Sequence, residues 1–173
     1  ESVLPKAVLD PGIFNRWGPD FAVEHGLVLA CNEGAVMTVG FGHRYPSVEV
    51  WSTSRVDQPW RVDDEGIDAV SDLLHAAHVA VSDDVPANEE WHYRPMGTGV
   101  TVPWRIILKL RISTLAGFEG GTKIYANTIS PAALAAMLLP KLFQARAAGR
   151  IAPMDLGDEC EIPRGALAAT WVR

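Results

Sequence analysis

Cysteine is scarce in this chain: there are two, Cys31 and Cys160, and they lie far apart in the sequence. Neither belongs to a C-x-x-C motif or to a zinc-binding spacing with histidine. The sequence therefore predicts neither a disulfide scaffold nor a structural zinc site, and we expect two reduced thiols in a cytoplasmic protein.

Long hydrophobic runs are also lacking. The longest candidate, Ile124 to Pro140, is interrupted by polar residues and by Pro131, so it falls short of the roughly 18 apolar residues that span a membrane. The first residues have neither the charged nor the apolar region of a signal peptide, and the chain begins with Glu1. We expect no membrane partner, and a chain that is one piece of a longer protein.

Basic residues are in deficit. The 15 lysines and arginines stand against 21 aspartates and glutamates, which gives a net charge of −6. Because nucleic acids and anionic membranes attract basic surfaces, we expect neither as a partner. With 173 residues, 48% of them hydrophobic, the chain is long enough for one domain with a real core.

Composition divides the chain into three segments. Residues 1–25 combine prolines, glycines and scattered aromatic residues without a sustained period, which predicts an irregular amino-terminal arm. Residues 26–148 show strand and helix patterns and form the predicted α+β domain. Residues 149–173 are again punctuated by proline and glycine, which predicts an extended carboxy-terminal tail.

The middle segment begins with strand patterns. Short apolar runs between turn residues predict three strands of a meander, and two later segments predict two more. Between them, apolar residues at helical spacing predict an amphipathic helix that Asp63 or Asp64 caps and that ends near Asp83. The predicted strands cover residues 27–31, 36–39, 48–51, 89–94 and 104–112, with a shorter one at 122–126.

A second helix is predicted after Ser130, a good N-cap, with Pro131 at its first position. Pro140 should kink or end this helix near Leu139, with a second piece reaching about Ala148. The whole pattern predicts an α+β fold, an antiparallel sheet with helices packed on one face. The opposite face would then stay free for chemistry or for a partner.

The strand at 104–112 alternates almost regularly, so that its two sides differ in polarity. Apolar side chains should face the core on one side, and cations should lie on the other together with Ile107. The predicted core residues are Ile106, Leu108, Leu110 and Ile112, and the cations are Arg105, Lys109 and Arg111.

The preceding strand has Glu90, His92 and Arg94 on one side. If the two strands pair with their polar sides together, the cations form a patch that suits the phosphate of a sugar phosphate or nucleotide. The alternative is a polar sheet face in which Glu90 merely pairs with Lys109 or Arg111. Periodicity does not separate the two interpretations.

The other histidines give weaker signals. His75 and His78 are three residues apart on the predicted helix, a spacing that can bind a metal. They lie off its apolar stripe, so a solvated helix face is the favoured interpretation. His25 and His43 fall in turn regions, and we assign them no role.

The segment 116–122 is rich in glycine but lacks the spacing of a phosphate-binding loop. Its glycines would let a ligand approach the backbone closely. Glu119, on this turn, could then accept a hydrogen bond from a sugar hydroxyl.

Several segments, in their order and spacing, resemble the second half of galactose-1-phosphate uridylyltransferases and their relatives. The resemblance covers roughly residues 20–140 and rests on a distributed pattern rather than on one motif. The segments are NEEWHYRP at 88–95, then 104–112, 116–119, Gly121-Thr122, Asn127 and Ser130-Pro131.

This resemblance implies a histidine-triad-like fold, two such halves in one parent chain, and a homodimer. In the family, the amino-terminal half has a His-Pro-His motif whose second histidine forms the covalent uridylyl intermediate. No H-x-H occurs among the five histidines here. We therefore expect no catalytic residue in this fragment, no activity of the fragment alone, and the amino-terminal half of the parent chain as its partner.

The resemblance also bears on metal binding. Many members of the family have three metal-binding histidines in this half, and His92 matches the first of them. Pro103 and Arg105 stand where the other two would be. One histidine cannot complete a four-ligand site, and a guanidinium beside it would repel a cation, so we predict no metal and no cofactor.

The sugar-contacting loop of the family is matched better. Phe118 and Glu119 match an aromatic-Glu pair that contacts the hexose, often across the dimer interface. Thr122 and Asn127 match Gly-Thr and Asn-Pro patterns of phosphorylase-like relatives, although Thr128 replaces the proline. The predicted binding set for a hexose phosphate or nucleotide sugar is Phe118, Glu119, Thr122, Asn127, His92, Arg94, Arg105 and Lys109.

Two hypotheses of function follow. In the first, the chain is the carboxy-terminal domain of a hexose-1-phosphate uridylyltransferase and contributes scaffold, dimer interface and the Glu119 loop. In the second, it is a non-catalytic module that binds sugar phosphates or a partner domain. A self-sufficient histidine-triad hydrolase is excluded because the triad is missing.

Overall fold

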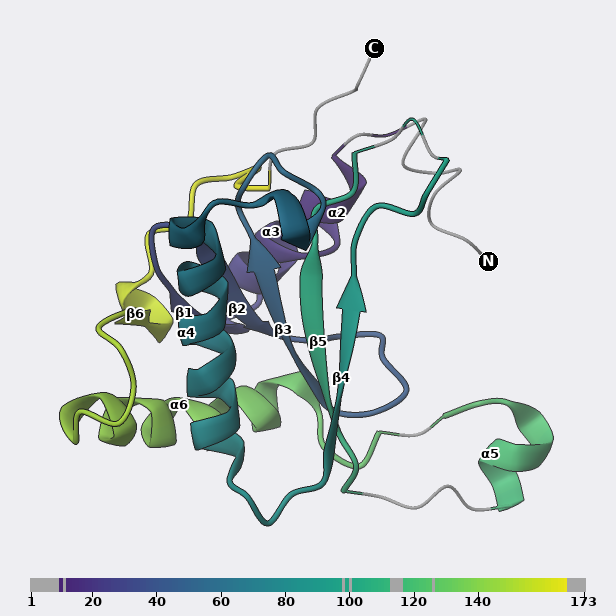
Figure 1. The fold of residues 1–173 in the computed structure, drawn as a ribbon. Helices are drawn as coiled ribbons and strands as arrows, with labels where there is room; N and C mark the ends of the chain where they lie inside the picture. Colours follow the sequence, from purple (N-terminus) through teal and green to yellow (C-terminus); the bar gives the residue numbers. More distant parts are fainter. Residues whose placement is uncertain are drawn as a thin grey trace.

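The computed structural model describes residues 10, 12–97, 99, 101–112, 117–125 and 127–167. They form an α+β fold on one six-stranded antiparallel sheet with the strand order β4-β5-β3-β2-β1-β6 (Figure 1). This confirms the predicted fold class. The strands are β1 (Val28–Cys31), β2 (Ala35–Val39), β3 (Ser47–Ser52), β4 (Ala87–His92), β5 (Arg105–Leu110) and β6 (Asp155–Leu156).

The alternation along β3 and β5 determines which face of the sheet is buried under the helices. Val48 pairs in register with Leu108, and Val50 with Ile106, and all four are at most 1% exposed. Burying a side chain of this size stabilises the fold by about 1.5–3 kcal/mol. Ile112, which was expected on the same face, lies beyond the end of β5 and is exposed.

Two helices, α4 (Asp64–Val81) and α6 (Pro131–Ala147), cover this face. α4 contacts β2 and β3, α6 contacts β1 and β2, and the two helices contact each other. Asp63 caps α4 and Ser130 caps α6, each side chain accepting a hydrogen bond from a backbone N–H three residues on. Both caps agree with the sequence prediction.

α6 does not end at Leu139 but continues through Pro140 to Ala147, close to the end near Ala148 that the sequence predicts. Ala136 lies four residues before Pro140, so its carbonyl would accept the N–H that proline lacks. Both residues lie on the exposed side of the helix. The carbonyl that loses its N–H partner is therefore on the solvent side. Leu138 and Leu142, on either side of the proline, are buried in the core and hold both halves of the helix in place.

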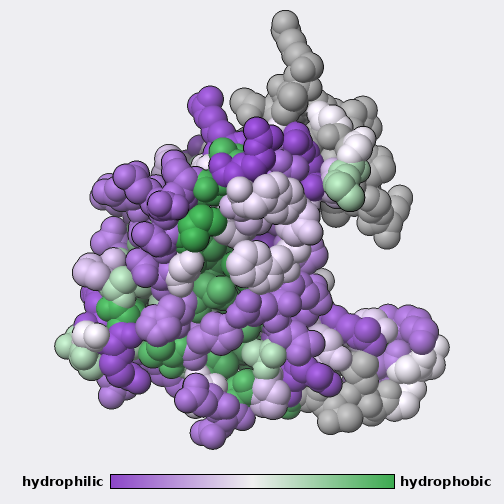
Figure 2. All heavy atoms as spheres, in the orientation of Figure 1, coloured by the Kyte–Doolittle hydropathy of each residue, from purple (hydrophilic) through white to green (hydrophobic). Residues whose placement is uncertain are grey.

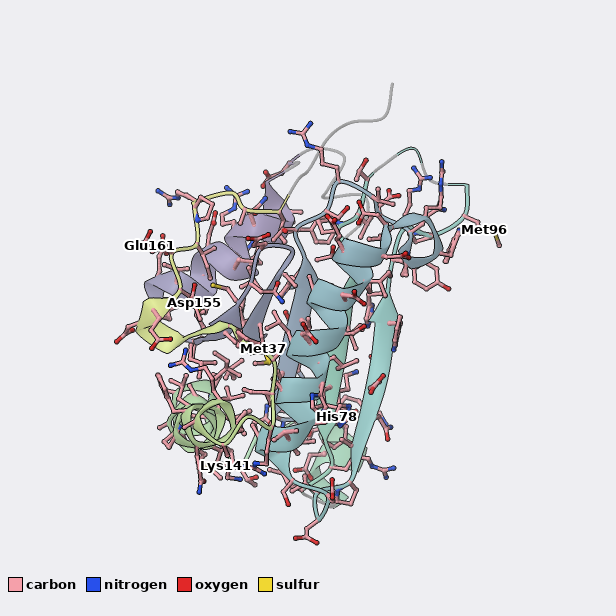
Figure 3. The ribbon with its side chains drawn as sticks, turned by 60° about the vertical axis from the view of Figure 1, so that its left-hand side comes forward. Met37, His78, Met96, Lys141, Asp155 and Glu161 are labelled. Atoms are coloured by element: carbon pink, nitrogen blue, oxygen red, sulfur yellow. The ribbon has the colours of Figure 1, made fainter. Side chains whose placement is uncertain are left out.

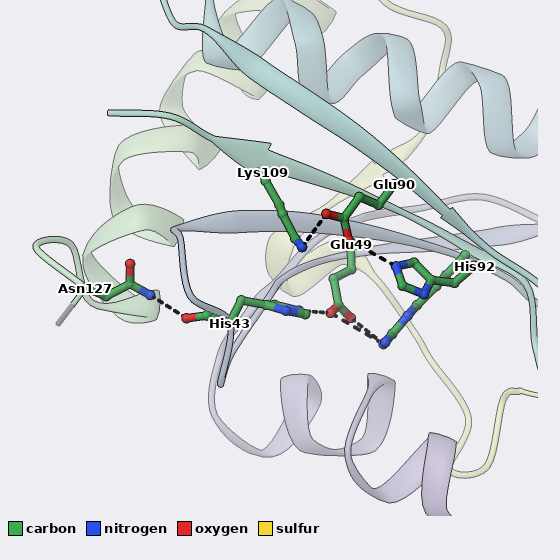
Figure 4. A network of polar contacts seen from close by, with 7 residues as sticks. His43, Glu49, Glu90, His92, Lys109 and Asn127 are labelled. Carbon is green, nitrogen blue, oxygen red and sulfur yellow. Dashed lines mark hydrogen bonds and ion pairs between the residues drawn. The ribbon is translucent and has the colours of Figure 1, made fainter. Parts of the chain in front are cut away.

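The arm that was expected to be irregular over residues 1–25 contains two short helices, α2 (Ile13–Arg16) and α3 (Pro19–Glu24). Pro19 occupies a first-turn position, where its missing N–H costs nothing. Phe21 stacks on Phe41 with ring centroids 4.0 Å apart. Both helices lie on the side of the sheet opposite α4 (Figure 4), so the face that was expected to be free is partly covered.

The arm and the carboxy-terminal segment are joined. The Asn15 side-chain amide donates to the Leu167 carbonyl at 2.8 Å, and the Leu167 N–H donates to Asn15 Oδ1 at 2.7 Å. Residues of the predicted tail form β6, which pairs with β1, and the 3-10 helix η2 (Gly157–Glu159). The division of the chain at residues 25 and 148 remains a prediction.

The short strand that was expected at 122–126 is wrong. Its first residue closes the helix α5 (Gly117–Thr122), residues 123–125 form no strand, and Ala126 lies outside the described residues. α5 projects away from the sheet (Figure 1). A strand needs a neighbouring strand to share its backbone hydrogen bonds, and the described residues 123–125 pair with none.

The face of the molecule that Figure 1 presents has a largely hydrophilic surface. Hydrophobic residues are visible on it in a narrow band beside α4 (Figure 2). Near this face, Trp60 of the 3-10 helix η1 (Pro59–Arg61) packs edge-on against Tyr93, with centroids 5.1 Å apart. Within the described residues, no helix combines the length and the apolar character that a membrane crossing needs.

Candidate functional site

Polar side chains of three neighbouring strands gather on the sheet face opposite α4 (Figure 4). β3 contributes Glu49, and β4 and β5 pair in a register that sets His92 opposite Arg105. Glu90 lies two residues before His92 on the same side of β4, and Lys109 lies four residues after Arg105 on the same side of β5. The polar sides of β4 and β5 therefore do coincide, as one interpretation of the sequence required.

Glu49 lies at the centre of this face, and its side chain is only 5% exposed. Its carboxylate accepts a hydrogen bond from His43 Nε2 and lies 3.4 Å from a guanidinium nitrogen of Arg105. The Arg105 guanidinium in turn stacks 4.3 Å above the ring of buried Trp51. A buried carboxylate needs such partners, because an unpaired charge in the interior is costly.

His43 reaches Glu49 because Gly40 leaves room for its ring. A Cβ at Gly40 would lie 2.7 Å from His43 Cδ2 and 2.4 Å from Ser47 Oγ. The backbone of His43 is held as well, since Asn127 Nδ2 donates to its carbonyl oxygen at 3.0 Å. Asn127, one of the predicted binding residues, thus contacts the backbone of a residue of this site, His43.

A second cluster lies next to the first. Glu90 pairs with Lys109 Nζ at 2.6 Å and with His92 Nε2 at 3.4 Å. The hydrogen bond from Lys109 lowers the pKa of Glu90. Burial, followed by the charge of Arg105, lowers the pKa of His92, so its imidazole is neutral near pH 7. The pairing of Glu90 with Lys109 is the contact that the alternative interpretation expected.

A cavity of about 400 Å³ opens beside Glu49. Its walls are mostly apolar and aromatic, and three polar groups converge in it, which is the composition of small-molecule sites. Trp17, one of these aromatic residues, is 58% exposed. The lining residues are Ile13, Phe14, Trp17, Phe41, His43, Glu49, Trp51 and Arg105.

Other predicted binding residues lie elsewhere. Arg94 follows the end of β4, and its side chain pairs with Asp57 at 3.3 Å. Glu119 and Thr122 belong to α5, which projects from the body of the domain (Figure 1). The side chain of Phe118 lies outside the described atoms. The structure thus brings His92, Arg105 and Lys109 together and leaves Arg94 and the α5 loop apart from them.

The metal site of the resembling family does not fit these residues. Arg105 faces His92 in the β4–β5 register, and its positive charge already depresses the pKa of that imidazole. A cation there would meet the same repulsion. The described ranges contain no group of three or more histidine, cysteine or acidic residues placed to hold a metal.

Sequence reasoning missed His43 and Glu49. Glu49 stands between Val48 and Val50, so the alternation of β3 already places it on the face opposite the core. A lone acid in an apolar strand was the available signal. His43 gave no such signal, because its place beside Glu49 depends on how the turn between β2 and β3 folds.

Comparison with known proteins supplies a family. The sequence profile of DUF4921, described as a domain of unknown function, matches residues 3–169. The chain belongs to the DUF4921 family. A comparison with curated protein sequences gave no match.

The DUF4921 chain also has the fold of solved structures. A structure described as a uridylyltransferase matches 82% of this chain with a TM-score of 0.68 and 15% identity. An ADP-glucose phosphorylase from Arabidopsis thaliana, with bound ADP-glucose, matches 68% with a TM-score of 0.60 and 20% identity. A GalT-like protein from the same plant matches 70% with a TM-score of 0.57 and 20% identity.

These likenesses confirm the uridylyltransferase-like fold that the sequence pattern implied. The matched region makes up 49% of the uridylyltransferase structure, 41% of the phosphorylase and 47% of the GalT-like protein. The DUF4921 chain therefore spans about half the length of each of these proteins.

Proposed function

We propose that this chain is the carboxy-terminal half of a nucleotidyltransferase-like protein, and that it binds the sugar-phosphate part of a nucleotide sugar or hexose phosphate without catalysing the transfer. The observation that carries the proposal is the cavity in which a buried carboxylate, a guanidinium and aromatic walls meet on the polar face of this fold. The bound ADP-glucose of one protein with the same fold supports the choice of ligand class.

The cavity and its surroundings match the two ends of such a ligand. The exposed face of Trp17 suits stacking with the apolar face of a sugar ring or with a base. Arg105 and Lys109 supply donors for phosphate oxygens. Both cations already form ion pairs, Arg105 with Glu49 and Lys109 with Glu90. A phosphate must compete with these carboxylates, so the isolated chain should bind the ligand weakly.

The proposal assigns the covalent step to another part of the protein. Nucleotidyl transfer through a covalent intermediate needs an imidazole that is free to attack phosphorus. The Nε2 atom of His43 contacts Glu49, and the Nε2 atom of His92 contacts Glu90. Neither imidazole is therefore free to attack. The remaining contributions of this half are scaffold, dimer interface and the α5 loop with Glu119.

Calorimetry tests the binding site directly. Glucose 1-phosphate, UDP-glucose and ADP-glucose should bind with a Kd on the order of 1 mM. Trp17→Ala and Lys109→Gln should each weaken binding about tenfold, which corresponds to about 1.4 kcal/mol. Arg164→Gln is the matched control, since Arg164 pairs with Glu24 and belongs neither to this cavity nor to the adjoining cluster of Glu90 and Lys109. Failure of every ligand to bind, or unchanged affinity in both variants, would contradict the proposal.

The α5 loop needs its own variant. Glu119→Ala should abolish any binding of a hexose 1-phosphate if the loop reaches the ligand. Unchanged binding in this variant would remove the loop from the site while leaving the cavity in it.

A second candidate function, an interaction module, is favoured by the edge of the sheet. β4 is an edge strand, and Trp91 and Tyr93 on or next to it are 51% and 42% exposed. Exposed aromatic residues on an edge strand are typical of a surface that binds another chain. A His-Pro-His segment in the rest of the protein would favour the transferase role, and its absence would favour the interaction module.

A further inference from the structure

The two cysteines, which are far apart in the sequence, are neighbours in the fold. β6 pairs with the end of β1 so that Cys31 lies opposite Asp155. The chain then turns through η2, and Cys160 returns to the backbone of this same Asp155. Cys160 Sγ donates to the Asp155 carbonyl at 3.3 Å.

The position of Cys160 is fixed by contacts of the residues just before it. Glu159, its neighbour, binds Arg146 of α6 through two hydrogen bonds of 2.5 and 2.9 Å and accepts a third from the Leu156 N–H. The Leu156 side chain is fully buried. The thiols therefore meet through a docked segment and not through a chance approach of a loose end.

Small molecules can reach the pair. Cys31 is one wall of an open groove of about 930 Å³ between β1, α6 and the carboxy-terminal segment. Asp155 and Glu161 also line this groove and lie along the carboxy-terminal segment (Figure 3). Cys160 itself is partly exposed, whereas Cys31 is buried.

We propose that Cys31 and Cys160 are a redox-active thiol pair that forms an intramolecular disulfide by exchange with a low-molecular-weight disulfide such as oxidised glutathione. The thiolate of one cysteine attacks the reagent disulfide, forms a mixed disulfide and releases one glutathione thiolate. The second cysteine, after losing its proton, attacks the protein sulfur of the mixed disulfide and releases the second glutathione. The protein loses two hydrogens, and one glutathione disulfide becomes two thiols.

A protein disulfide is favoured over a metal at this place. Two thiols alone do not complete the four-ligand set of a structural zinc site, and no third ligand of that kind is grouped with them in the described part of the chain. Cys31 is the cross-strand partner of Asp155, and Cys160 donates to the Asp155 carbonyl. The two thiols are therefore neighbours that an S–S bond of about 2 Å could join. This proposal does not depend on the proposed sugar-phosphate function.

The disulfide would fasten the carboxy-terminal segment to the sheet. It would link β1 to the residue after η2 and close a loop of most of the chain, which restricts the unfolded state strongly. Burial raises the pKa of both thiols. The thiolate fraction at neutral pH is therefore small, and the exchange should be slow at pH 7 and faster at higher pH.

The test equilibrates the 173-residue chain with a glutathione redox buffer and reads the products by intact mass and peptide mapping. The wild type should lose the mass of two hydrogens, yield a Cys31–Cys160 cross-linked peptide and lose both reactions with iodoacetamide. Its Tm should rise by roughly 10 °C on oxidation and return on reduction. Cys31→Ser and Cys160→Ser should each stop at a single glutathione adduct, without the change in Tm.

Two outcomes would overturn the proposal. One is a wild type that keeps both thiols reactive after equilibration with excess oxidised glutathione at pH 8.5 or above. This high pH is used because the pKa values of both thiols are raised. The other is a wild type that stops at the glutathione adduct, as the single variants do. Because Cys→Ser changes one atom, circular dichroism of the reduced variants separates a failure to fold from a failure to form the bond.

Discussion

A carboxylate that is 5% exposed must be paired, and Glu49 is paired on two sides, by His43 and by Arg105. Glu90 lies on the same face of the sheet, pairs with Lys109, and is 43% exposed. The two residues have the same chemistry and differ in burial. They therefore separate the cost of breaking a buried ion pair from that of breaking an exposed one.

Glu49→Ala should lower the free energy of unfolding by about 2–4 kcal/mol, because it leaves the Arg105 guanidinium and the His43 imidazole without their partner. Glu90→Ala should cost less than about 1 kcal/mol, because water replaces the lost carboxylate. Urea denaturation of the two variants measures the difference. Equal costs would mean that Glu49 is not the buried centre of this face.

At the scale of elements, β5 divides the molecule into a core side and a polar side. Leu108 is 1% exposed under the helices, and Lys109, the next residue, points to the polar face. This division was predictable, because alternation with a period of two is a local property of the backbone. α5 was not predictable, because the residues around a segment decide whether it becomes a helix or a strand.

Leu108→Asp should unfold the domain. The substitution places an unpaired charge between the sheet and the helices, and its cost approaches the whole stability of an ordinary domain of about 5–15 kcal/mol. Lys109→Ala, one residue further along the same strand, should cost less than about 1 kcal/mol. Far-UV circular dichroism and thermal denaturation distinguish the two. A folded Leu108→Asp variant would show that the facing of β5 is wrong.

At the scale of the whole molecule, the two ends of the chain hold the domain together. The amino-terminal arm binds the carboxy-terminal segment through Asn15 and Leu167, and the latter segment docks on α6 through Arg146 and Glu159. The hydrogen bond from Arg146, followed by that from the Leu156 N–H, lowers the pKa of Glu159 to about 2 from an ordinary value of 4.5.

This contact should make the docking of the carboxy-terminal segment depend on acid. A carboxyl whose pKa is lower in the folded state stabilises that state fully above pH 4.5, and the contribution is lost as the pH falls from 4.5 to about 2. Hydrogen exchange of the amides of residues 155–160 should therefore become faster over this range. In Glu159→Gln the acid-dependent step should disappear, and in Arg146→Gln it should become smaller, because the Leu156 N–H still donates to Glu159. A step of unchanged size in either variant would assign it to another group.

The sequence by itself determined the α+β class, the two helix caps and the two faces of β5, because each depends on residues that are close in the chain. It also placed His92, Arg105 and Lys109 on one polar side, once β4 and β5 were taken as partners. Only the tertiary structure decided that His43 meets Glu49, that Cys31 meets Cys160, and that the arm covers part of the polar face. Those contacts join segments whose distance in space is set by loop conformations and by the packing of the whole chain, and no local pattern of residues encodes that distance.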